Sequence, residues 1–242
     1  VISGGAACSV ILAENGEFSR ATKDIDIVLW LDTFERFDED FAKRLLECIE
    51  AGQYQTRIKA SGVREYYRFE NPKTSGYPIM LEFFSRHPNS LPLSDDQIKC
   101  RLVVEGDLIS LSAILLDDYY YQALLENKIE LRGLPLLNEN LLIPFKARAH
   151  IDLERKKAAG DPTAKSSDIK KHRTDIIRLL ALIPPARRVP LSDPLRRDVG
   201  QFMNKLAEEG YATQQVVPAL TLDIVLSAME DIFQVKRDEF PF

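Results

Sequence analysis

Cysteine and histidine are scarce in this sequence, with three residues of each among 242. Cys8, Cys48 and Cys100 are widely spaced and odd in number, which argues against a disulfide framework and fits free thiols in a reducing, cytoplasmic compartment. The histidines do not have the spacing of metal ligands. A metal in this protein would therefore be held by oxygen atoms, which favours Mg²⁺ or Mn²⁺.

Long apolar runs are also missing. The best stretches, residues 109–116 and 176–185, reach half of the roughly 20 apolar residues that a membrane helix needs, so no membrane partner is expected. The composition, 45% apolar and 29% charged, is typical of a soluble globular α/β or α+β protein with a packed core. Because the chain begins at Val1 without a methionine or a basic-then-apolar leader, we expect further residues before it.

Charge is unevenly distributed along the chain, although the total is only −5. Residues 146–197 hold 14 lysines and arginines against 6 acidic residues, a net charge of +8, whereas residues 1–145 carry −8 and residues 198–242 carry −5. A basic segment of this kind is suited to phosphate groups, which favours a nucleic-acid partner. An exposed pair of helices with solvated lysines is the alternative.

Apolar periodicity divides the chain into an α/β part and a helical part. The expected strands are residues 24–31, 55–60, 64–70, 78–84, 102–104, 109–115 and 129–131. The expected helices are residues 6–13, 34–51, 168–183, 195–209 and 220–233. We therefore predict an α+β fold in which residues 1–137 form a short mixed sheet flanked by helices and residues 138–242 form a helical domain.

Residues 101–137 are expected to consist of short strands and turns. This region contains the aromatic cluster Tyr119, Tyr120 and Tyr121, flanked by leucines. Such a cluster could stack on a base, but it is more often part of a core, so we expect it to be buried.

Two aspartates separated by one residue make the most informative motif. Asp24 and Asp26 alternate with Ile25 and Ile27 in an expected strand, so both carboxylates project from one face at roughly 6 to 7 Å from each other. Neighbouring carboxylates repel unless a cation neutralises them. Two divalent ions are the usual arrangement in sites that transfer phosphoryl or nucleotidyl groups.

A third carboxylate lies on a later expected strand. Glu82 interrupts the otherwise apolar run of residues 79–84, where an ionised side chain is costly without a positively charged partner. Together with the two aspartates it predicts an acidic, metal-binding trio. The alternatives are a solvent-facing glutamate or a glutamate paired with arginine or lysine.

A glycine pair stands before the aspartates in the chain. Gly4 and Gly5 precede an expected helix, where backbone amides can approach a phosphate closely and the helix dipole favours negative charge. An ordinary turn is the simpler interpretation of such a pair by itself. Arg20 and Thr22 alternate with the aspartates and are expected to face the same side.

The order Gly-Gly, helix, Arg-x-Thr-x-Asp-x-Asp and a later acidic residue resembles the nucleotidyltransferase fold of the DNA polymerase β superfamily, in particular the AbiEii/AbiGii-type toxin group. Residues 142–149, Leu-Ile-Pro-Phe-Lys-Ala-Arg-Ala, and residues 171–179, Lys-His-Arg-Thr-Asp-Ile-Ile-Arg-Leu, are similar to that group's later motifs. The likeness covers about residues 1–183. It departs from the polymerase β pattern in a longer gap of 18 residues between Gly5 and Asp24.

The resemblance implies a role for each matching residue. Asp24 and Asp26 would coordinate both metal ions, and Glu82 would complete the shell of the catalytic ion and help to deprotonate an acceptor hydroxyl. The residues implied in nucleotide binding are Ser3, Gly4 and Gly5 for the triphosphate, Arg20 and Thr22 as further candidates, Lys146 for charge neutralisation, and Lys171 and Asp175, which would touch the nucleotide or brace Lys146.

We therefore expect an enzyme, a Mg²⁺- or Mn²⁺-dependent nucleotidyltransferase that moves a nucleoside monophosphate from an NTP to an acceptor hydroxyl. The resemblance implies a cytoplasmic toxin with a cognate antitoxin, acting on an RNA such as tRNA or on a protein. A small-molecule acceptor, as in antibiotic-modifying relatives, is one alternative. A non-catalytic module that binds a nucleotide or a partner is another, although three mutually repelling acids argue against it.

Overall fold

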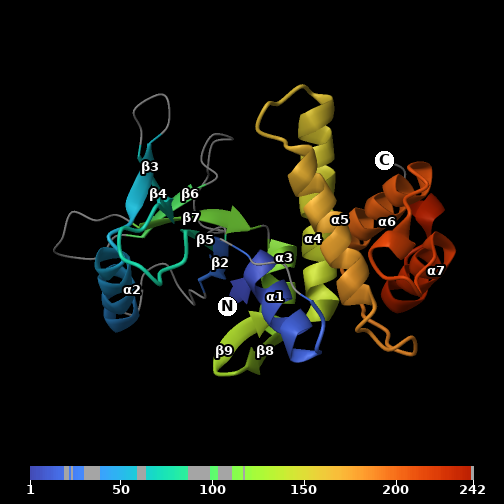
Figure 1. Cartoon of the computed structure of the whole chain (residues 1–242), viewed down its shortest axis with the longest axis horizontal. Helices are drawn as coiled ribbons and strands as arrows, with labels where there is room; N and C mark the ends of the chain where they lie inside the picture. Colours follow the sequence, from blue (N-terminus) through green and yellow to red (C-terminus); the bar gives the residue numbers. More distant parts are fainter. Residues whose placement is uncertain are drawn as a thin grey trace. The chain divides into compact units, whose positions relative to one another are not determined.

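The computed structural model describes residues 1–18, 22, 24–29, 39–58, 64–86, 99–102, 111–116 and 118–240. The chain forms two compact units. The first comprises residues 1–7 and 20–136, and the second comprises residues 8–19 and 137–242. The fold is α+β, as predicted: a mixed sheet occupies the first unit, and helices make up the second (Figure 1).

The described strands form one mixed sheet in the order β3-β4-β5-β2-β1-β9-β8, with β7 beside the far end of β5 and β6 beside β7. Strand β2 runs parallel to β5 and antiparallel to β1, and β4 runs antiparallel to β5. The strands are β1 Ile2–Ser3, β2 Asp24–Val28, β3 Gln55–Ile58, β4 Arg64–Glu70, β5 Met80–Arg86, β6 Lys99–Leu102, β7 Leu111–Leu116, β8 Lys128–Leu131 and β9 Leu134–Leu137.

Helices lie both between the strands and after them. They are α1 Gly4–Glu14, α2 Glu39–Ala51, α3 Asp118–Glu126, α4 Glu139–Ala158, α5 Ser166–Leu180, α6 Asp193–Glu208 and α7 Leu222–Phe233, with short 3-10 turns at η1 Thr213–Gln215 and η2 Arg237–Glu239. Asn138 caps α4 by accepting a hydrogen bond from the Leu141 amide (3.1 Å), which explains why the helix starts there. Among the described residues, no helix combines the length and the apolar content that crossing a bilayer requires.

The predicted elements are largely confirmed, with one error. Residues 118–126 were expected among strands and turns, but they form α3. Tyr120, Tyr121 and Leu124 are spaced so that one helical face carries all three, and all three are buried. The aromatic cluster is therefore in the core as expected, except for Tyr119, which is 58% exposed. Parts of the expected elements at residues 30–38 and 103–110 lie outside the described residues.

The core of the first unit lies on one face of the sheet. Phe69, Leu81 and Phe83 from β4 and β5 pack with Leu29 and with Ile49 of α2. Ile25 and Ile27 of β2 are partly buried against the same cluster. Because side chains alternate along a strand, this arrangement leaves the intervening residues of β2, β4 and β5 on the opposite face.

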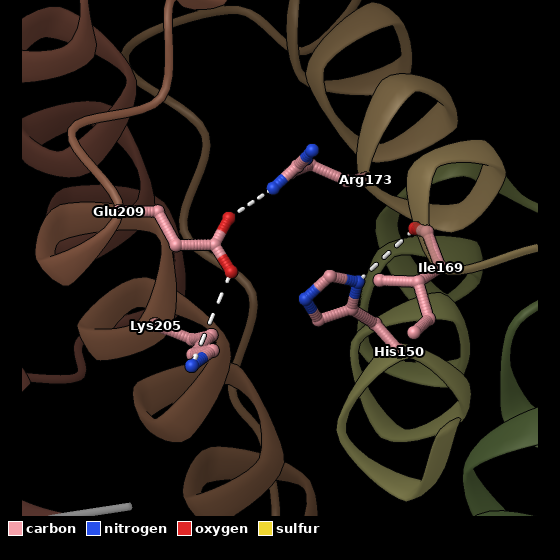
Figure 2. A network of polar contacts seen from close by, with 5 residues as sticks. All are labelled: His150, Ile169, Arg173, Lys205 and Glu209. Carbon is pink, nitrogen blue, oxygen red and sulfur yellow. Dashed lines mark hydrogen bonds and ion pairs between the residues drawn. The ribbon is translucent and has the colours of Figure 1, made fainter. Parts of the chain in front are cut away.

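In the second unit, α4 packs against α5 and α6. Figure 2 shows a polar network that links these helices: His150 Nδ1 of α4 donates to the Ile169 carbonyl of α5 (3.2 Å), and Arg173 of α5 forms an ion pair with Glu209, just after α6. Lys205 approaches the same carboxylate (4.0 Å). Arg173 also stacks over the Tyr211 ring at 3.7 Å, so the C-terminal end of α6 is held to α5 by several directional contacts.

Candidate functional site

Four side chains form a row across four strands of the sheet. Ser3 of β1 lies opposite Asp26 of β2, Asp26 lies beside Glu82 of β5, and Glu82 lies opposite Arg68 of β4. Residues that are paired in register share a face of the sheet. The face that carries this row is the one opposite the α2 core, and we call it the acidic face.

Asp24 adds a second carboxylate on β2. It is in register with Met80 and stands two residues before Asp26, so both aspartates belong to the acidic face. The predicted alternation is confirmed, since Ile25 and Ile27 pack with the core on the other face. The parallel pairing of β2 with β5 therefore brings Asp24, Asp26 and Glu82 to one surface, as the sequence motif predicted.

Gly4 is fitted to the carboxylate of Asp26. Its φ of +60° lies in the left-handed region, and a Cβ at this position would stand 1.7 Å from Asp26 Oδ2. Any larger side chain would collide with the carboxylate. The first residue of α1 thus lies directly against Asp26, at the helix end where the dipole favours negative charge.

Glu82 is 8% exposed and pairs with Arg68. Arg68 Nε donates to Glu82 Oε1 at 3.0 Å, and Arg68 Nη2 donates to the same oxygen. Burial raises the pKa of the Glu82 carboxyl above its usual value, while the Arg68 guanidinium opposes this and the charges of Asp26 and Asp24 add to it. The neighbouring acids therefore interact unfavourably, and Arg68 is the positive charge that offsets this.

The acidic face offers the right chemistry for Mg²⁺ or Mn²⁺ but not a finished three-ligand site. Asp24, Asp26 and Glu82 supply oxygen atoms, which these ions prefer. Within the described ranges, however, no three histidine, cysteine, aspartate or glutamate side chains are arranged to hold a metal ion. Because both guanidinium contacts engage Glu82 Oε1, the third carboxylate is turned toward Arg68. The two aspartates offer oxygen ligands to a divalent cation, while Arg68 contacts one of the two carboxylate oxygens of Glu82.

The remaining residues expected near the triphosphate have different surroundings. Ser3 and Gly5 are buried at the start of α1. Thr22 donates from its hydroxyl to the Asp24 carbonyl (3.1 Å), so it supports the entry into β2. Arg20 lies outside the described residues.

The second unit holds the helix-borne residues of the later motifs. Lys146 Nζ of α4 donates to Asp175 Oδ2 of α5 at 2.7 Å, with the two side chains 2% and 7% exposed. Of the two roles expected for Asp175, this geometry shows the bracing of Lys146. Lys171 stands one turn before Asp175 on α5 and is partly buried.

Comparison with known proteins does not identify a family for this chain. A scan against family models, a search of curated proteins and a search of solved structures each give no significant match to this chain.

Arg68 is the residue of this site that the sequence analysis did not identify. Its place is set by the register of β4 on β5, and the two strands are joined by the nine residues from Asn71 to Ile79. A connection of that length does not fix register by turn type, unlike a two-residue hairpin. The available signal was the expectation that a buried Glu82 requires a cationic partner.

Proposed function

We propose that this chain is a divalent-cation-dependent nucleotidyltransferase that moves a nucleoside monophosphate from an NTP to an acceptor hydroxyl. The observation that carries the proposal is the acidic face, where Asp24, Asp26 and Glu82 are gathered by parallel pairing of two strands and Asp26 lies against Gly4. A structural domain has no use for three acids in one place, because each raises the cost of ionising the others.

The proposed reaction divides the work among the residues of the acidic face. Asp24 and Asp26 would hold Mg²⁺ or Mn²⁺, which supplies Lewis-acid stabilisation of the phosphate oxygens. Ser3, Gly4 and Gly5 would place the triphosphate at the start of α1. The acceptor oxygen forms a bond to the α-phosphorus, the bond from that phosphorus to the β-phosphate bridging oxygen breaks, and pyrophosphate leaves. Glu82 would take the proton of the acceptor hydroxyl.

The resemblance implies charge neutralisation by Lys146, and in the proposal Asp175 holds the lysine in position. A buried lysine–aspartate pair is a poor device for stability, since apolar residues of similar size often serve as well or better. The near-complete burial of both side chains therefore supports a functional reason for keeping them. Lys171, one turn away, is a further candidate for the same task.

An RNA is the proposed acceptor, with a protein acceptor as the alternative, in keeping with a toxin that would be countered by an antitoxin. The support is the basic segment of residues 146–197, several of whose cations are exposed on the second unit: Arg155, Lys156 and Lys157 at the end of α4, and Lys165 and Lys170 at the start of α5. Lysines and arginines in such numbers neutralise RNA phosphates.

A non-catalytic nucleotide-binding module is the second candidate. It is favoured by one observation: Arg68 already neutralises Glu82 without any metal ion. In this version the acidic face would be a self-contained ion-pair network and no bond would be made or broken.

Labelled nucleotides separate these candidates. Wild type and an Asp24→Asn/Asp26→Asn variant are incubated with each of four α-³²P-labelled NTPs, Mg²⁺, and total cellular RNA and protein. Label in the RNA or the protein fraction with wild type alone supports the transferase and identifies donor and acceptor class. Mg²⁺-dependent NTP binding without label in any fraction, including small molecules, supports the non-catalytic module.

A further inference from the structure

The acidic face contains its own cation, Arg68. The Arg68 side chain is 23% exposed, whereas the Glu82 side chain that it contacts is 10% exposed. Arg68 therefore reaches from solvent to a nearly buried carboxylate that stands beside Asp26. Arg68 supplies positive charge to the Glu82 carboxylate, as a bound divalent ion would.

The geometry of the pair makes arginine and metal mutually exclusive at Glu82 Oε1. Two guanidinium nitrogens, Nε and Nη2, donate to that oxygen, and an oxygen that accepts two charged hydrogen bonds has no room for a metal bond of about 2.1 Å. Among the described residues, no three histidine, cysteine, aspartate or glutamate side chains are arranged to hold a metal ion. Arg68 thus competes with a metal ion at this oxygen and reduces the negative charge that Glu82 offers to it.

We propose that Arg68 is a positioning residue that exchanges partners: it holds Glu82 before substrate arrives, and it transfers to a phosphate of the incoming triphosphate when Glu82 turns to the metal. This inference rests on the proposed function. The guanidinium is suited to the exchange because its planar fork binds carboxylate and phosphate oxygens with the same geometry. Its partial exposure leaves it accessible to a ligand that approaches from solvent.

If Arg68 exchanges partners, the substitution Arg68→Gln should change the affinities for Mn²⁺ and for tripolyphosphate in opposite directions. In Arg68→Gln, Mn²⁺ alone no longer competes with the guanidinium, so we expect it to bind about five- to tenfold more tightly, as measured by electron paramagnetic resonance of free Mn²⁺. The same variant loses a phosphate ligand, so we expect inorganic tripolyphosphate in EDTA to bind about tenfold more weakly by calorimetry. General damage to the fold would weaken both.

Four further variants serve as controls for this test. Lys73→Gln removes the same charge from an exposed position between β4 and β5, and it should change neither affinity by more than about twofold. Arg68→Lys keeps the charge without the planar fork, so its affinities for Mn²⁺ and tripolyphosphate should be intermediate. It replaces Arg68→Gln in the test if that variant folds poorly. Glu82→Gln should abolish the gain, so the double variant Arg68→Gln/Glu82→Gln should bind Mn²⁺ no more tightly than Glu82→Gln.

The outcomes separate this inference from the proposed function. Opposite shifts in Arg68→Gln support the exchange. Equal-sign shifts or unchanged Mn²⁺ affinity, in a wild-type protein that transfers label from NTP, overturn the exchange and leave the transferase standing. Failure of the wild type to bind either probe, together with no transfer of label, overturns both.

Discussion

Lys146 Nζ donates to Asp175 Oδ2 at 2.7 Å across the α4–α5 contact, and both side chains are almost completely buried. The pair has lost nearly all of its hydration, so each charge depends on the other. The Arg148–Asp152 pair on α4 differs in this respect, since its atoms are 3.9 Å apart and its side chains are 43% and 50% exposed. The two pairs give a matched comparison between a buried and a solvated ion pair.

Asp175→Leu should destabilise the protein by about 3 to 5 kcal/mol, because it leaves the Lys146 ammonium buried without a partner. The double variant Lys146→Met/Asp175→Leu should recover most of that loss while remaining inactive as a transferase. Urea unfolding at pH 7.5 measures both. Asp152→Ala is the control and should cost less than about 1 kcal/mol. A double variant as unstable as Asp175→Leu would contradict the view that the pair serves function more than stability.

Gly4→Ala should weaken Mn²⁺ binding at the acidic face, and the strain that alanine adds to the backbone should account for only part of this effect. Gly4 and Gly133 both have positive φ values, +60° and +75°, so alanine at either site costs about 1 to 2 kcal/mol. At Gly133 an added Cβ meets nothing within 4 Å, whereas at Gly4 it meets Asp26 Oδ2 at 1.7 Å. We expect Gly4→Ala alone to lose Mn²⁺ binding, and equal Mn²⁺ affinities of the two variants would refute the assigned contact.

Removing one acid from the acidic face should stabilise the protein in the absence of metal. Asp24 contributes to the raised pKa of Glu82, so the two carboxyls repel each other. Asp24→Asn keeps the shape and removes the charge, and we expect its free energy of unfolding in EDTA to rise by about 0.5 kcal/mol. Excess Mn²⁺ should reverse the order by stabilising wild type more than the variant. A lower stability of Asp24→Asn in EDTA would show that the repulsion is already compensated.

The stability of the second unit should fall as the pH drops below about 6.5, the ordinary pKa of histidine. Burial lowers the pKa of His150 in the folded protein, so the unfolded chain binds a proton that the folded chain resists. The contribution is fully present above the unfolded pKa and is lost as the pH falls toward the folded pKa. Thermal unfolding at pH 7.5 and pH 5.5 should show a smaller decrease for His150→Gln than for wild type.

One outcome for His150→Gln would contradict this prediction. An unchanged pH dependence in the variant would mean that the titration arises at another group. The network in Figure 2 explains why the substitution itself should be tolerated: a glutamine amide can donate to the Ile169 carbonyl in place of the ring nitrogen.

Local sequence patterns predicted most of the secondary structure and the composition of the acidic face. Alternation of Asp24 and Asp26 with two isoleucines determined which side chains leave the core, and the structure confirms it. The helix α3 was not predicted because consecutive tyrosines have a local preference for strand. The helix forms because packing in the folded protein buries one of its faces.

Long-range pairing was beyond the reach of the sequence. The neighbourhood of Arg68 and Glu82 follows from strand register across a nine-residue connection, and the contact of Gly4 with Asp26 follows from antiparallel pairing of β1 with β2. Neither depends on a local propensity, because register is set by the burial of whole strand faces. The sequence left two roles open for Asp175, contact with a nucleotide or bracing of Lys146. Helix packing, which decides which helix faces meet, brings Asp175 to Lys146.

Parallel reactions with α- and γ-labelled NTP test whether the acidic face catalyses nucleotidyl transfer. Wild type, Asp26→Asn and the exposed control Glu126→Gln are compared with Mg²⁺ and total RNA. We expect wild type and the control to transfer α-label to acceptor and to release γ-label as pyrophosphate, and we expect Asp26→Asn to transfer at least about a hundredfold less. Transfer of γ-label to acceptor, or an Asp26→Asn variant as active as wild type, would contradict this expectation.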